Sequence, residues 1–354
     1  MADTTVVPVS AVKYGLKAET TFGDALDNSG ADGTAYLTQP VIQAQKPTFN
    51  ITRESRLLSG RGTMKHKSDT IVNAKGGTVT MPFDMIATPK TLAQHLALVG
   101  QKPSTSGSTV HIQTFSGASA TSIGGTISSG VPHSCNLAWY PAASAGIRVA
   151  GVVCSDLTIS GDVAANNGLL TMSGNYYSGF SNPVATATAI EIDHTIAGWT
   201  AAETTYFNIM EMATRTLDVD DNATQTFILK SFNLNIANGV NRFGFDTNGY
   251  AFPEYAITGD LTIKYDGEFN YAAANNVLQD FLDGDTLTLN MIIGDSAPNA
   301  LGEMEITAEI QYTGDPSLDL SEGGLYHNLP FECVSDGTFG LKTEVFHNAA
   351  LTTL

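Results

Sequence analysis

Short segments in which apolar and polar residues alternate recur along this chain of 354 residues. Phe232, Leu234 and Ile236, for example, alternate with asparagines at 233 and 235. A side-chain period of two is typical of a β-strand with one face buried and the other in water, as in antiparallel sheets. The same pattern occurs in residues 49–53, 261–265 and 287–291, and Asn-Gly or Asp-Gly turn pairs stand at 167–168, 238–239, 248–249 and 336–337. The chain is therefore predicted to be mainly β.

Only two stretches have the spacing of an α-helix. Residues 89–99 begin with Pro89, which the first turn of a helix tolerates, and end before Gly100. Residues 271–283 place apolar side chains on one face and end before Gly284. The sequence thus predicts one short helix in each half of the chain.

The two halves share a series of similar segments in the same order. The pairs are FNI at 49–51 with FNL at 232–234, VTMPFD at 79–84 with LTIKYD at 261–266, and TLAQHL at 91–96 with VLQDFL at 277–282. The offsets are 183, 182 and 186 residues, and a fourth pair, NNGLL at 166–170 with EGGLY at 322–326, has an offset of 156. An inserted loop at 103–130 accounts for the change of offset. The order strand, turn, strand, helix, strand occurs twice, which predicts an internal duplication.

This duplication predicts two tandem antiparallel β-sandwich or barrel units, each flanked by a short α-helix. We expect an N-terminal arm at 1–39 and a first unit at 40–185 that contains the inserted loop. A connector at 186–224 then leads to a second unit at 225–354.

The net charge of −18 is unevenly distributed along the chain. Residues 1–215 hold 13 Lys and Arg against 14 Asp and Glu, whereas residues 216–354 hold 4 against 21. Gripping nucleic acid requires a basic face, so this balance argues against a protein that binds DNA by neutralising phosphates. An acidic wall along which DNA slides without sticking remains compatible with it.

Cysteine content and hydropathy indicate where such a chain is made. Cys135, Cys154 and Cys333 form no C-x-x-C pair and too sparse a set for a disulfide framework, so we expect reduced, buried thiols. The first residues lack the apolar core of a signal peptide, and no apolar run is long enough to span a membrane. We therefore expect synthesis in a cytoplasm.

No residue pattern indicates catalysis or a cofactor, and we expect no enzyme. The seven histidines form no zinc-binding motif. His95 lies on the first predicted helix, where it is expected to be partly buried and to serve packing. His133 and Cys135 share a strand face and form no catalytic dyad. A calcium-binding loop at 218–229 is excluded, because Ala223 and Leu229 replace its required Gly and Glu. A looser calcium site at Asp218, Asp220 and Asp221 and a sugar-binding face made of Trp139, Tyr140, Tyr176, Tyr177 and Phe180 stay open as alternatives.

Three stretches of the chain resemble the tail tube proteins of long-tailed phages. They are VKYGLKAETTFGD at 12–24, SRLLSGRGTMKHKSDTIVNAKGGTVTMPFDM at 55–85, and SFNLNIANGVN at 231–241 with YAITGDLTIKYDG at 255–267. The resemblance implies a tail-tube-like β-sandwich flanked by a helix. It also implies subunits that form rings, and rings that stack into a hollow tube around a tape-measure protein and later conduct DNA. Further expected partners are the tail terminator and distal tail proteins, and the expected location is the tail of the virion.

Most members of that family carry one such unit and form six-membered rings. Two units in this chain imply rings of three chains, with six chains as the alternative. Polar, acidic side chains are expected to line the channel, where contact with passing DNA is transient and non-specific. A virion or cell-surface adhesin that binds carbohydrate is the alternative function.

The long polar connections at 54–76 and 237–256 correspond to a loop that, in the family, reaches the neighbouring ring. The first connection and its flank are rich in basic residues, while the second half of the chain is acidic. We hypothesise that this basic segment docks on an acidic face of the next ring; the alternative is a charged loop that only faces water. The residues expected at this contact are Arg53, Arg56, Arg61, Lys65, Lys67, Lys75 and Arg242.

Overall fold

The structure of the chain is a computed structural model. It describes residues 12–19, 36–42, 45–55, 70–100, 104–106, 110–115, 122–123, 133–142, 145–179, 190–194, 199–200, 205–219, 223–242, 250–252, 255–272, 276–294, 302–320, 324–335 and 340–346.

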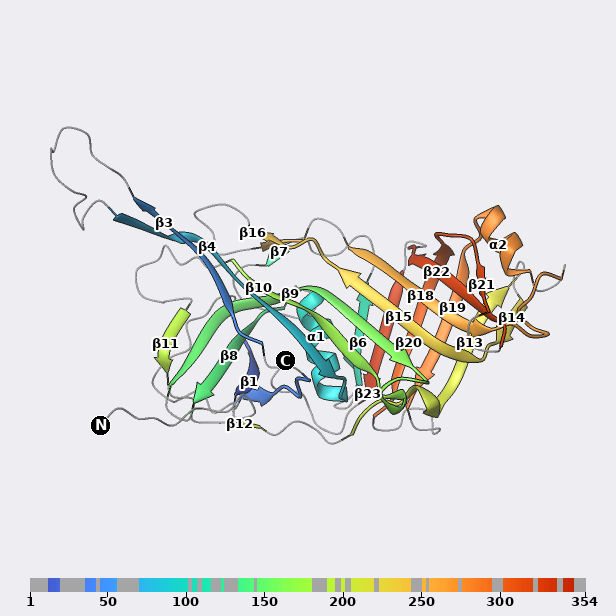
Figure 1. The fold of residues 1–354 in the computed structure, drawn as a ribbon, viewed down its shortest axis with the longest axis horizontal. Helices are drawn as coiled ribbons and strands as arrows, with labels where there is room; N and C mark the ends of the chain where they lie inside the picture. Colours follow the sequence, from blue (N-terminus) through green and yellow to red (C-terminus); the bar gives the residue numbers. More distant parts are fainter. Residues whose placement is uncertain are drawn as a thin grey trace.

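One antiparallel sheet, which we name the common sheet, runs through both halves of the molecule (Figure 1). Each of its strands pairs with the next in an antiparallel sense, and the halves of the chain meet where β9 pairs with β15. In spatial order the strands are β3 (Thr48–Ser55), β4 (Thr70–Ile86), β10 (Thr171–Ser178), β9 (Ala145–Asp162), β15 (Leu229–Ala237), β18 (Ala256–Lys264), β22 (Tyr326–Cys333) and β21 (Ser317–Asp319).

A second layer of strands crosses behind the common sheet in two groups (Figure 1). The first group has the order β2 (Tyr36–Thr38), β1 (Lys13–Ala18), β8 (Cys135–Ala142), β9 and β11 (Ile190–His194), with β12 (Trp199–Thr200) parallel to β2. The second group has the order β14 (Ala223–Thr226), β13 (Met212–Val219), β19 (Leu287–Ile293), β20 (Met304–Tyr312), β23 (Leu341–Phe346), β6 (Val110–Phe115) and β5 (Ser104–Ser106). A small separate sheet joins β7 (Ser122–Ile123), β17 (Tyr250–Ala251) and β16 (Asn241–Arg242).

β9 belongs to both layers. Its residues up to Val152 pair with β8, and those from Val153 onward pair with β10. Gly151 lies at the change of layer with a φ of 63°, a backbone conformation that glycine adopts without a Cβ clash. Its N–H donates to Oε1 of the buried Glu19 at 2.8 Å, which fixes the bend.

The space between the layers is filled by the apolar side chains that the alternation predicted. Phe232, Leu234 and Ile236 of β15 all point inward, with Leu157 and Ile159 of β9 beside them. Burial of such side chains contributes about 1.5–3 kcal/mol each. The predicted strands are confirmed: residues 49–53 lie in β3, 232–236 in β15, 261–264 in β18 and 287–291 in β19. The predicted alternation of burial is confirmed in β15 and β19.

The first predicted helix is confirmed as α1 (Pro89–Val99), which is buried on nearly all sides. The second is shorter than predicted, because α2 spans only Val277–Asp283. The Asn276 side chain caps its N-terminus by accepting from the N–H groups of Leu278 and Gln279 at 3.1 and 3.3 Å, so the helix begins there. Gly284, with a φ of 72°, ends α2 as predicted.

Three predicted loop segments contain strands. Residues 103–130 include β5, β6 and β7, and β6 pairs with β23 of the second half. The expected connector at 186–224 includes β11 and β13, which pair with β9 and β19. The polar connection at 54–76 is shorter than predicted, because β3 and β4 continue to Ser55 and from Thr70 as a two-stranded arm (Figure 1).

Candidate assembly surfaces

The common sheet ends in two different strands. In the described part of the chain, β3 pairs only with β4, and β21 pairs only with β22. Each therefore presents one edge whose N–H and C=O groups can pair with a further strand. Because eight strands alternate in direction, β3 and β21 run antiparallel to each other. A strand with the direction of β3 can thus continue the sheet beyond β21 without breaking the antiparallel pattern.

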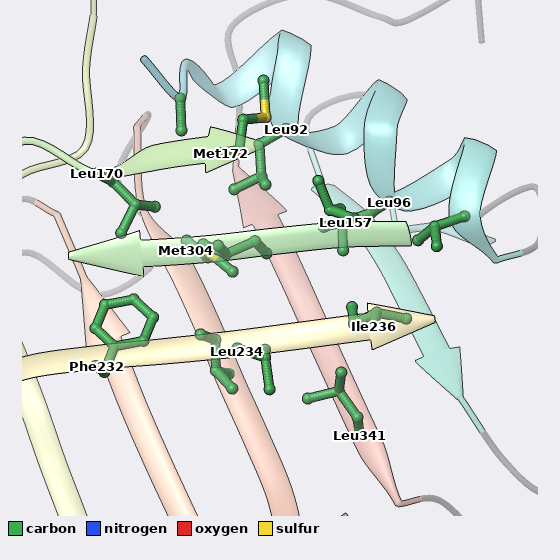
Figure 2. Close-up of a cluster of buried hydrophobic side chains, with 14 of the residues drawn as sticks. Leu92, Leu96, Leu157, Leu170, Met172, Phe232, Leu234, Ile236, Met304 and Leu341 are labelled. Carbon is green, nitrogen blue, oxygen red and sulfur yellow. The ribbon is translucent and has the colours of Figure 1, made fainter. Parts of the chain in front are cut away.

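The contact between the two halves shows how this sequence builds a strand-to-strand joint. β15 lies along the edge of β9, with Leu234 opposite Ile159 and Ile236 opposite Leu157. Behind these strands, α1 packs against β23 and β6. Figure 2 shows Leu96 of α1 in one cluster with Leu157 and Ile236 and with other side chains from both halves of the chain. The joint therefore combines strand pairing with a continuous apolar core.

Exposed apolar side chains gather at the far end of the second half. Of the nine large apolar side chains that are exposed in the described residues, five lie here: Ile228, Tyr271, Leu282, Leu320 and Leu325. The Ile228 and Leu325 carbonyls accept from the adjacent N–H groups of Lys264 and Tyr265, so both residues border the end of β18. Tyr271 donates from its hydroxyl to the Pro316 carbonyl at 3.1 Å, beside β21.

The outward face of the common sheet is polar and acidic. Hydroxyl and amide side chains are hydrogen-bonded across it, as between Thr158 and Asn235 at 3.0 Å and between Thr262 and Asn328 at 3.0 Å. Six carboxylates of the described residues share this face: Asp84, Asp156, Asp162, Asp260, Asp319 and Glu332. Two lysines stand near its β21 end, and Lys230 is paired there with Asp319 at 3.8 Å. The face offers phosphate groups few cations and several like charges.

The predicted inter-ring residues are only partly within the described residues. Arg53 lies in β3, Lys75 in β4 and Arg242 in β16, where the structure describes the backbone alone. The other four, which lie outside the described residues, are Arg56, Arg61, Lys65 and Lys67. Their contact therefore stays a prediction.

The aromatic residues considered for a sugar-binding face are not gathered on a surface. Tyr176 is buried, with its ring stacked on Phe83 at a centroid distance of 4.5 Å, and Tyr140 is buried on the other layer. Trp139 donates from its indole to the Gln45 carbonyl at 3.0 Å, and Phe180 lies outside the described residues.

The considered calcium site is not assembled in the described part of the chain. Asp218 accepts from the Thr224 hydroxyl at 2.8 Å, while Asp220 and Asp221 lie outside that part. The described residues contain no group of three His, Cys, Asp or Glu side chains that could hold a metal ion.

The three cysteines are free thiols, and Cys333 is only partly buried. Burial raises the pKa of Cys135 and Cys154 well above that of an ordinary thiol, and that of Cys333 to about 12. Thiols with such raised pKa values are poor nucleophiles.

Sequence reasoning missed the exposed apolar residues at the end of the second half. Leu282 lies at the end of the predicted helix but was not assigned to its apolar face. The available signal was the alignment of Leu282 with Leu96 in the duplicated helix segments. In the structure Leu96 is buried, whereas its counterpart Leu282 is exposed.

The fold and these surfaces define a β protein built on one continuous antiparallel sheet that, in the described residues, ends in two unlike edge strands and carries an acidic face. The chain belongs to the phage tail tube protein family, which it matches over residues 10–333. It is therefore a structural component of the virion tail, from a family that is not one of enzymes. No curated protein matches the chain. Within the described residues, no helix has the length and apolarity needed to cross a membrane.

Proposed function

We propose that this chain is the subunit that polymerises into stacked rings and forms the hollow tail tube through which DNA is delivered. The observation that carries the proposal is the common sheet with its unlike end strands, β3 and β21, each paired with one strand in the described residues, in a member of the tail tube family. Association of two unlike edges is head-to-tail, and it produces a ring when the rotation between subunits closes. Closure pairs both end strands of the common sheet and removes the aggregation hazard of these open edges.

The proposed ring contains three chains, because each chain carries two tube units. The first unit has the pairing order β2–β1–β8–β9–β10–β4–β3, and the second has the order β14–β13–β19–β20–β22–β18–β15. The corresponding strands also follow each other in the same order along the chain. Phe49 lies opposite Val79 just as Phe232 lies opposite Leu261, so the similar segments share one register.

These pairings favour wider units than the sequence alone suggested. β1 and β2 complete the first unit, and β13 and β14 complete the second, so the proposed units begin near residues 12 and 212. Six units in three chains give the ring approximate sixfold symmetry. A ring of six chains is the alternative stoichiometry.

The acidic outward face of the common sheet is the proposed wall of the channel. It is the surface that continues from the first unit into the second, whereas the second layer consists of two groups that are not paired to each other in the described residues. Its carboxylates repel phosphates, so DNA passes with only transient contact. The tape-measure protein would occupy the same channel before DNA does, and tail terminator and distal tail proteins would contact the ends of the tube.

The basic segment between β3 and β4 is the proposed contact between rings. It joins the ends of the two-stranded arm that extends from the body of the first unit (Figure 1). Opposite charges on the acidic second unit of the next ring would give the stack its direction and register. Arg242 is the corresponding candidate in the second unit.

Reversal of the charge of this segment tests the inter-ring contact. The variant Arg56→Glu, Arg61→Glu, Lys65→Glu and Lys67→Glu is expected to fold and to form rings but not to extend into tubes. Electron microscopy measures tube length. The control variant, Arg56→Lys, Arg61→Lys, Lys65→Arg and Lys67→Arg, keeps the positive charge at each position. Tubes of normal length from the reversed variant would contradict the contact.

The function itself is tested with the purified full-length chain. Sedimentation analysis is expected to show a species of about 112 kDa, three times the chain mass of 37.3 kDa, and electron microscopy is expected to show rings and hollow tubes. A species twice that mass would favour six chains per ring. A protein that stays monomeric under all conditions and binds glycans would support the adhesin alternative.

A further inference from the structure

We propose that copies of this chain join by repeating the joint already present between its two halves: β3 of one copy docks on β21 and α2 at the far end of the next copy. The partner is thus a second copy of the same chain. This inference rests on the proposed ring and names the surfaces that close it.

The two helices carry the main argument, because they occupy equivalent places and differ in what covers them. The segments TLAQHL and VLQDFL place Leu96 of α1 at the position of Leu282 of α2. Leu96 is 2% exposed, in the cluster that Figure 2 shows between the halves of the chain, whereas Leu282 is 66% exposed. α1 packs chiefly against β9 of its own unit, and also against β23 of the second unit and against β6, whereas α2 packs against β20 of its own unit. In the described residues, α2 therefore keeps the contact with its own unit but has no counterpart of the contact that α1 makes with β23.

The strands show the same difference. β15 is paired on both edges, with β9 and with β18, and its Phe232 is 2% exposed. β3 is paired on one edge in the described residues, and the equivalent Phe49 is only partly buried. β3 thus corresponds to a strand whose second partner is missing.

The acceptor edge, which is the strand edge that would pair with β3 of another copy, can be located from the residues that lie opposite each other in neighbouring strands. Asn175 lies opposite both Pro82 and Asp156, and Tyr326 lies opposite both Lys264 and Asp319. Pro82 and Lys264 are equivalent in the similar segments, so Asp319 corresponds to Asp156, with an offset of 151 residues between Asn175 and Tyr326 in place of the 156 between 166–170 and 322–326. β20 is thus the counterpart of the part of β9 that pairs with β8, and β21 is the counterpart of the part that pairs with β10.

Asp156 is the residue at which β9 receives the end of β15, opposite Ala237. Leu320, the next residue after β21, then corresponds to Leu157, which is fully buried in the joint between the halves. Leu320 is 68% exposed. The β21 edge is thus the place where the described structure has an acceptor strand paired with β22 and, in Leu320, an exposed apolar side chain beside it.

Side-chain orientation and strand direction agree with this docking. Phe49 lies on the core side of the common sheet, opposite the buried Val79, and Leu318 of β21 lies opposite the buried His327. When β3 is added beyond β21 in the antiparallel direction, both strands keep their apolar side chains on the core side. The polar faces of successive copies then form one surface.

Photocrosslinking in assembled rings tests which surfaces meet. A benzophenone amino acid replaces Leu320, rings are formed from equal amounts of ¹⁴N- and ¹⁵N-labelled chains, and crosslinked peptides are identified by mass spectrometry. The expected product joins residue 320 of one copy to the peptide containing residues 45–55 of a differently labelled copy. Crosslinks in intact rings that map to another element would overturn the joint and leave the proposed ring standing. If the wild-type chain forms no assembly at all, the ring and the joint both fail.

A matched pair of substitutions measures the contribution of α2. Leu282→Asp is expected to leave the circular dichroism spectrum and melting temperature of the isolated chain unchanged, because the side chain is exposed there. It should raise the concentration needed for half-maximal ring formation by about tenfold or more, since a charge would be buried in the joint. Met210→Asp, at a side chain 62% exposed on a short turn in residues 209–211, is expected to leave ring formation unchanged. Normal ring formation by Leu282→Asp would overturn the role of α2.

Discussion

At the scale of single residues, the most unusual group in the core is His95 of α1. Its Nδ1 donates to the Thr91 carbonyl at 2.6 Å, and in the neutral ring Nε2 accepts from the Tyr176 hydroxyl, also at 2.6 Å. Phe83 lies against both rings. Full burial lowers the pKa of His95 to about 4. The sequence predicted a packing role for His95, but its hydrogen bond to Tyr176, 81 residues away, has no local signal in the sequence.

This lowered pKa predicts that the fold loses stability in mild acid. The unfolded chain takes up a proton near pH 6.5 and the folded chain only near pH 4, so the contribution is complete above about pH 6.5 and declines as the pH falls toward 4. The loss amounts to about 3 kcal/mol at the acid limit. Urea denaturation of unassembled protein at about pH 7 and about pH 4.5 measures it. His95→Phe, which introduces the residue found at the equivalent position 281, should reduce the pH dependence by about this amount; an unchanged dependence would contradict the assignment.

At the scale of the elements, the strands and α1 could be predicted because their patterns are local. The alternation around Phe232 and the Pro89 and Gly100 signals each lie within one segment. The pairing of β9 with β15 and of β6 with β23 depends on contacts between distant segments, which no local pattern encodes. For the same reason the insertion at 103–130 was predicted as a loop although it contains β6. The acidic character of the candidate surface was predictable from composition, whereas the exposed end near Leu320 was not.

Close contact between strands explains a glycine in β18 and leads to a prediction. A Cβ at Gly259 would lie 2.5 Å from the Asn233 carbonyl oxygen and 2.4 Å from the Phe331 ring. Gly259→Ala must therefore shift a backbone strand or a buried aromatic ring, which is expected to destabilise the chain by about 2 kcal/mol. Gly267→Ala is the control, because nothing lies within 4 Å of a Cβ there. Urea denaturation compares the two, and equal stabilities would show that the sheet accommodates the added methyl group.

At the scale of the whole molecule, the common sheet relates strand pairing to the proposed tube. The sheet offers an acidic face on one side and an apolar face, covered by the second layer, on the other. When copies continue the sheet around a ring, one of these sides must face the channel. The common sheet is continuous across both halves, whereas the second layer is divided into two groups in the described residues, which favours the common sheet as the wall. The acidic face is thus expected inside and the second layer outside.

Two exposed threonines distinguish inside from outside. Thr258 lies on the acidic face in β18, and Thr114 lies on the second layer in β6, opposite Lys342. In assembled tubes, Thr114→Cys is expected to react with a small maleimide and with one carrying a large polyethylene glycol chain. Thr258→Cys should react only with the small reagent, because the large chain cannot enter the channel. In unassembled protein both cysteines should react with both reagents, and the wild-type chain corrects for the native thiols, of which Cys333 is the most exposed. Rapid labelling of Thr258→Cys by the large reagent along intact tubes would place the acidic face outside and remove the physical reason for its charge.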